Sequence, residues 1–128
     1  MPNLVDLAEI SPIQVWDGVV ARRVDGEQLT LAVVELAPNA LVAEHRHPNE
    51  QCGLVIEGEM HFRIADEVRV LGPGGTWRIV GNVPHEVTAG PEGAVVVDVF
   101  APVRTDWAEK PLAGTPEEPA VLLWPRGR

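Results

Sequence analysis

The chain has 128 residues, of which 45% are hydrophobic, and it carries 12 glycines, 12 prolines and a formal net charge of −9. This length accommodates one domain with a hydrophobic core, and the composition excludes a disordered chain. The acidic balance excludes nucleic acid and anionic membrane surfaces as expected partners, because both repel negative charge.

Three further features concern the cellular compartment. The first ten residues lack a basic stretch followed by an apolar one, so we expect no signal peptide. No apolar run approaches the roughly 20 residues that a membrane helix needs. The single cysteine excludes an internal disulfide. Together these features predict a cytoplasmic protein.

Short apolar segments separated by turn residues follow one another along the chain, with no helical periodicity of useful length. Asp25-Gly26 predicts a hairpin, Glu57-Gly58 predicts a turn, and residues 89–93 predict a loop. About ten short strands are expected, the clearest of them at residues 13–24, 29–36, 42–47, 51–56, 60–64, 68–71, 76–80, 85–88 and 94–100.

Residues 60–64 show the alternation of a half-buried strand. Met60, Phe62 and Ile64 alternate with polar residues, so we expect them to face the core and His61 to face solvent. Many short strands at nearly even spacing are typical of an all-β sandwich or barrel. There is no internal repeat, so a single barrel is expected.

Two histidines, one residue apart, precede an apolar strand. His45, His47 and Gln51 share the same parity, so a strand would point all three toward one face. Glu50 has the opposite parity and stays a reserve candidate, since Pro48 can bend the chain there. Imidazoles with one oxygen ligand suit zinc, iron, nickel or manganese. The pair alone is also compatible with two surface histidines.

A third histidine strengthens the metal interpretation. His85 follows the tight turn Asn82-Val83-Pro84, about forty residues after the first pair. This distance allows an antiparallel strand to return beside the first pair. A site built from both segments is therefore expected.

The two histidine segments resemble the motifs of the cupin family. HRHPNEQCGLVIEG matches the first motif in spacing, although Gln51 replaces the usual Glu and Asn39 stands near the usual Gly. GGTWRIVGNVPH is similar to the looser second motif. The resemblance covers residues 29–107 and implies a cupin double-stranded β-helix, or jelly-roll barrel, in a single domain. It also implies four metal ligands, which are His45, His47, Gln51 and His85.

The resemblance divides the chain into N-terminal strands at 1–28, the cupin barrel at 29–107 and an extended C-terminal tail at 108–128. The expected cofactor is one divalent transition metal, Zn, Ni, Mn or Fe. Three imidazoles and an amide are neutral and leave the ion its full charge, which favours a Lewis acid over an oxygen-activating centre.

A second informative segment is VVVDVFAPVRTDW, in which Asp98 interrupts an apolar strand and Arg104 follows Pro102. A buried carboxylate needs a partner or a catalytic role. One interpretation is a structural Asp98–Arg104 ion pair. The other is an acid–base group beside an arginine that binds an anionic substrate.

This segment is similar to one in small bacterial cupins that linearise unsaturated monouronates. That resemblance implies a metal-dependent isomerase or lyase that opens the ring of a small anionic, carbohydrate-like substrate. Asp98 would move protons and Arg104 would bind the substrate carboxylate. The alternatives are a non-haem iron dioxygenase, a ligand-binding or sensing cupin without turnover, and a polyketide-type cyclase.

Three other predictions concern single side chains and assembly. Trp77 and Trp107 are expected either in the core or as walls of a sugar pocket, and Cys52 is expected as a small buried residue. The tail ends in an apolar segment, residues 121–124, that packs across its own barrel or onto a second subunit. An apolar patch of that kind favours a homodimer.

Overall fold

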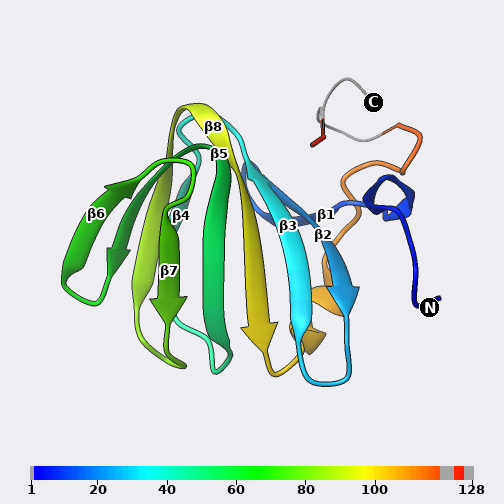
Figure 1. Cartoon of the computed structure of the whole chain (residues 1–128), viewed down its shortest axis with the longest axis horizontal. Helices are drawn as coiled ribbons and strands as arrows, with labels where there is room; N and C mark the ends of the chain where they lie inside the picture. Colours follow the sequence, from blue (N-terminus) through cyan, green and yellow to red (C-terminus); the bar gives the residue numbers. More distant parts are fainter. Residues whose placement is uncertain (1, 119–122, 126–128) are drawn as a thin grey trace.

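The computed structural model describes residues 2–118 and 123–125 and is built almost entirely of antiparallel β-strands (Figure 1). Two short 3-10 helices, η1 (Leu7–Glu9) and η2 (Thr105–Glu109), flank the strands. Within this part of the chain, no helix has the length and hydropathy needed to span a membrane. The strands are β1 (Ile13–Trp16), β2 (Val19–Asp25), β3 (Thr30–Leu36), β4 (Leu41–His45), β5 (Glu50–Ile64), β6 (Glu67–Leu71), β7 (Thr76–Ile79) and β8 (His85–Ala101).

The long strands β5 and β8 connect the two halves of the barrel. They pair with each other over nearly their whole length. The second half of β8 continues through β3 and β2 to β1, whereas its first half pairs with β4. The start of β5 pairs with β7 and its end with β6. Two sheets therefore share the same two strands, which gives the expected jelly-roll barrel (Figure 1).

β5 bends where it crosses from one sheet to the other. Its register with β8 shifts between Val55 and Glu57 and again between Gly58 and Met60. Gly58 has a φ of 83°, and a Cβ atom there would lie 2.1 Å from the carbonyl oxygen of Gly93. Only glycine accepts both the left-handed conformation and this close approach. The bulges let the strand curve without ending.

This curvature corrects two predictions. The expected turn at Glu57-Gly58 is a bulge inside β5, and the expected loop at 89–93 lies within β8. Gly and Pro were interpreted as turn residues, but inter-strand pairing continues through both segments. A third correction concerns 13–24, where Asp17-Gly18 divides the expected single strand into β1 and β2. Asp17-Gly18 is itself an Asp-Gly hairpin signal, like Asp25-Gly26.

The core fills the space between the two sheets. Met60 and Phe62 are 2% and 5% exposed, while His61 is exposed, as the alternation predicts. Phe62 packs against Trp77 with ring centroids 4.9 Å apart. Along this strand, residues that face the core therefore alternate with residues that face solvent.

The C-terminal tail packs along the N-terminal strands. Leu112 forms an isolated bridge with Ile13. Farther along, the backbone N–H of Trp124 donates to Glu35 and its carbonyl accepts from Arg22, so this part packs on its own barrel. Residues 121 and 122 of the predicted apolar segment lie outside the described residues. The division at 28/29 and 107/108 stays a prediction.

Candidate metal centre and substrate cavity

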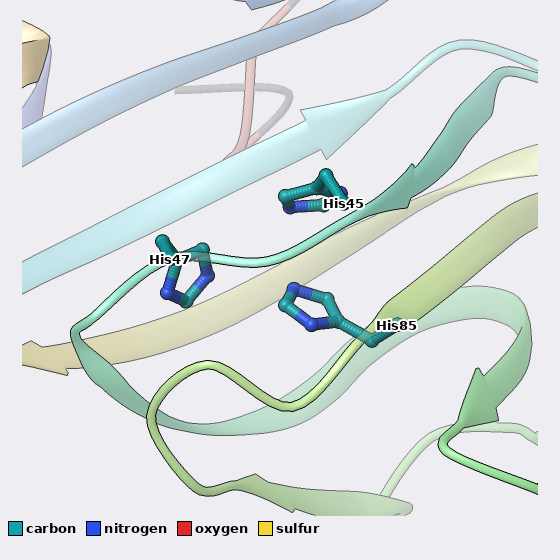
Figure 2. A group of neighbouring side chains, drawn as sticks. All are labelled: His45, His47 and His85. Atoms are coloured by element: carbon teal, nitrogen blue, oxygen red, sulfur yellow. The ribbon is translucent and has the colours of Figure 1, made fainter.

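The three predicted histidines come together at one point inside the barrel (Figure 2). His45 ends β4 and pairs in register with His85, which opens β8. His47 lies in the segment between β4 and β5, because β4 ends at His45 and not at residue 47 as expected. One nitrogen of each ring lies within 4.8 Å of the others. This spacing is suited to binding one ion.

Each histidine is oriented by a backbone carbonyl two residues away. Nδ1 lies 2.9 Å from the carbonyl oxygen of Ala43 for His45 and of Asn49 for His47. The corresponding distance from His85 to Val83 is also 2.9 Å. In the neutral ring, a proton on Nδ1 makes this bond and leaves a lone pair on Nε2. Nδ1–H bonds of this kind orient metal-ligating histidines in proteins.

Burial favours the neutral form of His47 and His85, which is the form that binds a metal. It lowers the pKa of His85 to about 4, and the neighbouring histidines and Arg104 act in the same direction. The pKa of His47 is also lowered, first by burial and then by the charge of Arg104. Nε2 of His85 is buried and has no hydrogen-bond partner among the described residues. A buried nitrogen of this kind indicates a missing partner.

Gln51 provides the test of whether these residues fit a cation. Its Nε2 donates to Oδ1 of Asp98 at 2.8 Å, so its Oε1 points the other way, 3.1 Å from Nε2 of His47. With the His47 proton on Nδ1, two lone pairs face each other and repel. A cation bound to both removes the repulsion. Two acceptors about 3 Å apart are close enough to bind the same ion.

Asp98 lies on the inner face of β8 and is 6% exposed. Its Oδ1 accepts from Gln51 and also from Nε1 of Trp77, each at 2.8 Å. Burial raises the pKa of Asp98 to about 6, although both hydrogen bonds and the charge of Arg104 oppose this. A carboxyl group with this pKa is able to accept and release protons near neutral pH.

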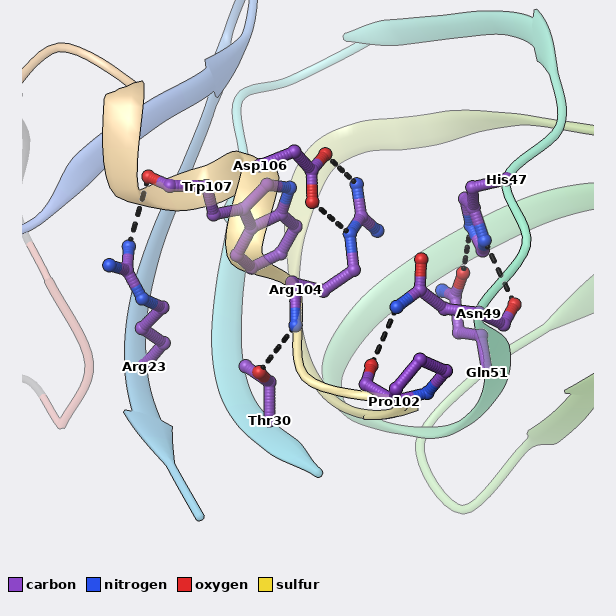
Figure 3. A network of polar contacts seen from close by, with 9 residues as sticks. All are labelled: Arg23, Thr30, His47, Asn49, Gln51, Pro102, Arg104, Asp106 and Trp107. Atoms are coloured by element: carbon purple, nitrogen blue, oxygen red, sulfur yellow. Dashed lines mark hydrogen bonds and ion pairs between the residues drawn. The ribbon is translucent and has the colours of Figure 1, made fainter. Parts of the chain in front are cut away.

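Arg104 is held in the same cavity by aromatic and acidic neighbours. Its Cζ lies 4.7 Å from the ring centroids of both Phe100 and Trp107. Nε and a terminal nitrogen donate to the two carboxylate oxygens of Asp106, at 3.1 and 3.0 Å (Figure 3). The alternative of an Asp98–Arg104 ion pair is therefore wrong, since each group has other partners.

These groups line one cavity of about 280 Å³ inside the barrel. Arg46, Arg104 and Lys110 contribute positive charge to its wall, beside Asp98 and Asp106. The chain as a whole has a net charge of −9, so this cavity is locally enriched in cations. It therefore favours an anionic ligand.

A larger cavity of about 650 Å³ lies across the sheet from the histidines. Its wall includes four acids and, among the described residues, no histidine. It neither attracts an anion nor offers imidazole ligands. The acids are Asp17, Glu35, Glu57 and Glu92.

The other sequence candidates lie away from the metal cluster. Glu50 is exposed, as its parity predicts, and His61 is exposed and contacts Glu59 at 2.9 Å. Cys52 is exposed, so its predicted burial was wrong. Trp77 belongs to the core and Trp107 lines the cavity, each 6% exposed.

Two residues of this region were not identified from the sequence. Asn49 donates to the carbonyl of Pro102 at 2.6 Å and so joins the segment after His47 to the segment before Arg104 (Figure 3). Nothing in the sequence indicates this contact. Asp106 pairs with Arg104, and its position two residues later was an available signal for a local ion pair.

The cupin domain family matches residues 32–100, which is more than half of the chain. The chain belongs to the cupin family. It is 29% identical over 96 residues to the pectin degradation protein KdgF of Dickeya dadantii (strain 3937), covering 73% of this cupin and 87% of that protein.

Two solved structures have a similar fold. The structure of KdgF from Halomonas sp. has a TM-score of 0.76 at 23% identity, covering 83% of this cupin and 98% of that chain. An RmlC-like cupin from Shewanella frigidimarina has a TM-score of 0.77 at 21% identity, covering 83% and 96%. At these identities the likenesses support the fold alone.

Proposed function

We propose that this cupin is a metal-dependent isomerase that opens the ring of an unsaturated monouronate. The observation that carries the proposal is one cavity in which a neutral ligand cluster lies beside a buried carboxyl group and a fixed arginine. The 29% identical pectin degradation protein supports a substrate derived from a uronate polymer. The cationic wall supports an anionic sugar acid.

The metal would be held by His45, His47, Gln51 and His85. The ion is one of Zn, Ni, Mn or Fe, and the nature of the ligands favours none of these metals alone. When bound, it supplies Lewis-acid polarisation of a substrate oxygen. The neutral ligands keep that polarisation strong, because no carboxylate offsets the charge of the ion.

Arg104 would bind the substrate carboxylate. Phe100 and Trp107 both pack against its guanidinium, and Asp106 occupies only two of its donor positions. Arginine has five N–H donors, so a terminal edge stays available for a carboxylate. Binding there would orient the sugar ring with its reacting end toward Asp98.

Asp98 would move the protons of the isomerisation. It takes the proton of the hydroxyl at C1, the bond between C1 and the ring oxygen breaks, and C1 becomes an aldehyde. The ring oxygen leaves as an enolate at C5, and Asp98 returns a proton to C4, which makes C5 a ketone. The product is an isomer of the substrate, so no further reactant is needed.

The first experiment is elemental analysis of the purified wild type, His47→Ala and His61→Ala. We expect one metal per chain in the wild type and in His61→Ala, because His61 faces solvent. We expect none in His47→Ala. Equal metal content in all three proteins would overturn the ligand assignment.

The second experiment measures turnover of unsaturated galacturonate by the loss of short-wavelength ultraviolet absorbance as its conjugated double bond disappears. We expect metal-dependent loss without oxygen consumption. Oxygen consumption with an iron-loaded protein would instead support the dioxygenase. Tight binding of the uronate with no product would support a non-catalytic binding cupin.

We also propose a cytoplasmic homodimer in which a second copy covers the outer face of β3, β5 and β8. On this face Leu31 pairs with Val99 and Val97 with Leu54, and the two leucines are 41% and 38% exposed. These four side chains are uncharged, so two acidic chains meet there without opposed carboxylates. Light scattering should give the mass of a dimer for the wild type and of a monomer for Leu31→Lys/Leu54→Lys. A monomeric wild type would contradict this proposal.

A further inference from the structure

Three residues on adjacent strands lie directly opposite one another beneath the proposed metal centre. Gly53 of β5 pairs in register with Asp98 of β8 on one side and with Trp77 of β7 on the other. Trp77 and Asp98 are each 6% exposed. Trp77 does not line the cavity, so it lies behind the groups that face a ligand.

The absence of a side chain at Gly53 lets the indole of Trp77 reach Asp98. A Cβ atom on residue 53 would lie 2.3 Å from Cε2 and from Nε1 of Trp77. The indole therefore occupies the space that the side chain of any amino acid other than glycine would fill at position 53. By crossing β5 at this point, Trp77 brings its Nε1 within 2.8 Å of Oδ1 of Asp98.

The indole N–H restricts what Asp98 does at that oxygen. Indole Nε1–H is a donor only, so Oδ1 must act as an acceptor toward Trp77. The same oxygen is 2.8 Å from Nε2 of Gln51. As a carboxylate oxygen, Oδ1 accepts from both Trp77 and Gln51, and its bond to Gln51 requires the NH₂ end of the amide.

The two ends of a glutamine amide have nearly the same shape but opposite hydrogen-bonding character. With its NH₂ end on Asp98, Gln51 turns Oε1 toward His47, 3.1 Å away. The reversed amide would present N–H groups to the imidazoles and would offer no lone pair to a cation. The orientation of Gln51 thus decides whether the cluster has a fourth ligand.

We propose that Trp77, admitted by Gly53, is a positioning residue that acts through Asp98 to hold Gln51 Oε1 toward the three histidines. The inference rests on the proposed metal centre and adds a residue outside it. Contacts behind the ligands of a metal site typically contribute about 10–100-fold to metal affinity. Trp77 is assigned this role because its N–H is directed at the acceptor that orients Gln51.

The test is a zinc titration of metal-free wild type, Trp77→Phe and Ile13→Val by competition with a chelator. Trp77→Phe keeps an aromatic ring in the core and removes the N–H donor, so we expect zinc affinity to fall about 10–100-fold. Ile13 is 6% exposed on β1 and is absent from the cavity wall. Ile13→Val should lower the melting temperature and leave zinc affinity unchanged.

A double-mutant cycle separates positioning from a general structural effect. In Gln51→Ala no amide remains to be oriented, so adding Trp77→Phe should not lower zinc affinity further. Nitrogen-15 NMR gives a readout without metal or turnover. The side-chain amide signals of Gln51 should move in Trp77→Phe and stay in place in Ile13→Val.

The outcomes distinguish this inference from the proposed function. If Trp77→Phe binds zinc with wild-type affinity, the positioning role of Trp77 is overturned and the proposed function is not. An equal loss in the Gln51→Ala background also overturns it, because the effect would not pass through the amide. A wild type that binds no zinc, nickel, manganese or iron overturns both.

Discussion

Two buried polar clusters lie on opposite sides of one sheet, and their hydrogen bonding differs. On the outer side, Arg22 contacts Glu35 at 3.3 Å and also donates to the carbonyls of Leu7 and Trp124. On the inner side, the histidines use Nδ1 for backbone carbonyls. One nitrogen of each ring lies within 4.8 Å of the others, and Nε2 of His47 is 3.1 Å from Oε1 of Gln51.

A structural polar cluster differs from a binding site in whether its polar groups satisfy one another within the chain. The outer cluster joins a cation to an anion within the chain and so needs nothing from outside. Among the described residues, the inner cluster brings several acceptors close together, and Nε2 of His85 has no donor. Such a set gains stability when a positive ion binds.

The largest expected effect comes from breaking the outer cluster. Arg22→Met removes the guanidinium that contacts the buried carboxylate of Glu35, and we expect the free energy of unfolding to fall by about 3–5 kcal/mol. Urea denaturation measures it. Zinc affinity should stay at the wild-type value.

The double variant Arg22→Met/Glu35→Leu is the matched control, since replacing both partners of a buried pair by apolar residues is often neutral. It should recover most of the lost stability. If Arg22→Met alone were as stable as the wild type, the outer cluster would not be a structural one.

A second effect should belong to the inner cluster alone. Zinc at about 100 times its dissociation constant should add about 2.7 kcal/mol to the stability of the wild type. His85→Ala should lose this increment, because the buried Nε2 that lacks a partner is removed. Thermal melts with and without zinc test this, with His61→Ala as the control that keeps the increment. An increment that survives in His85→Ala would place the ion elsewhere.

Arg104 should affect substrate binding more than folding. Lysine lacks the planar guanidinium that packs on Phe100 and Trp107 and binds a carboxylate through two N–H groups. Arg104→Lys should therefore raise KM for the uronate about 10–100-fold. Steady-state kinetics measure it, with metal content as the control. A KM that stays at the wild-type value would show that the carboxylate binds elsewhere.

Asp106 should give the smallest change. Its side chain is 60% exposed, so Asp106→Asn should cost less than about 1 kcal/mol of unfolding free energy at pH 7. The hydrogen bond from Arg104 lowers the pKa of Asp106, so its contribution is present above the unfolded pKa, near 4. It is lost as the pH falls through the lower folded value, where wild type and variant should converge. A difference that grows on acidification would contradict this.

Local features of the sequence predicted that three histidines would lie together. The His-x-His spacing and the turn before His85 indicated residues that the structure places together. Alternation correctly placed Phe62 inside and His61 outside. These features are local, because the direction of a side chain in a strand depends on its neighbours along the chain.

Contacts between distant strands were not predictable in the same way. The burial of Cys52 was wrong, since its exposure depends on what covers the outer face of β5. The turn at Glu57-Gly58 was wrong because pairing with β8 carries the strand through a bulge. Both outcomes depend on elements about forty residues away or more.

Residue identity and spacing are sufficient to predict the type of fold, the candidate ligands and the neutral character of the expected metal shell. Only the tertiary structure decided that Asp98 bonds to Gln51 and Trp77 while Arg104 pairs with Asp106. The physical reason is inter-strand register. It alone sets Gly53 between Trp77 and Asp98, and no local pattern encodes that alignment.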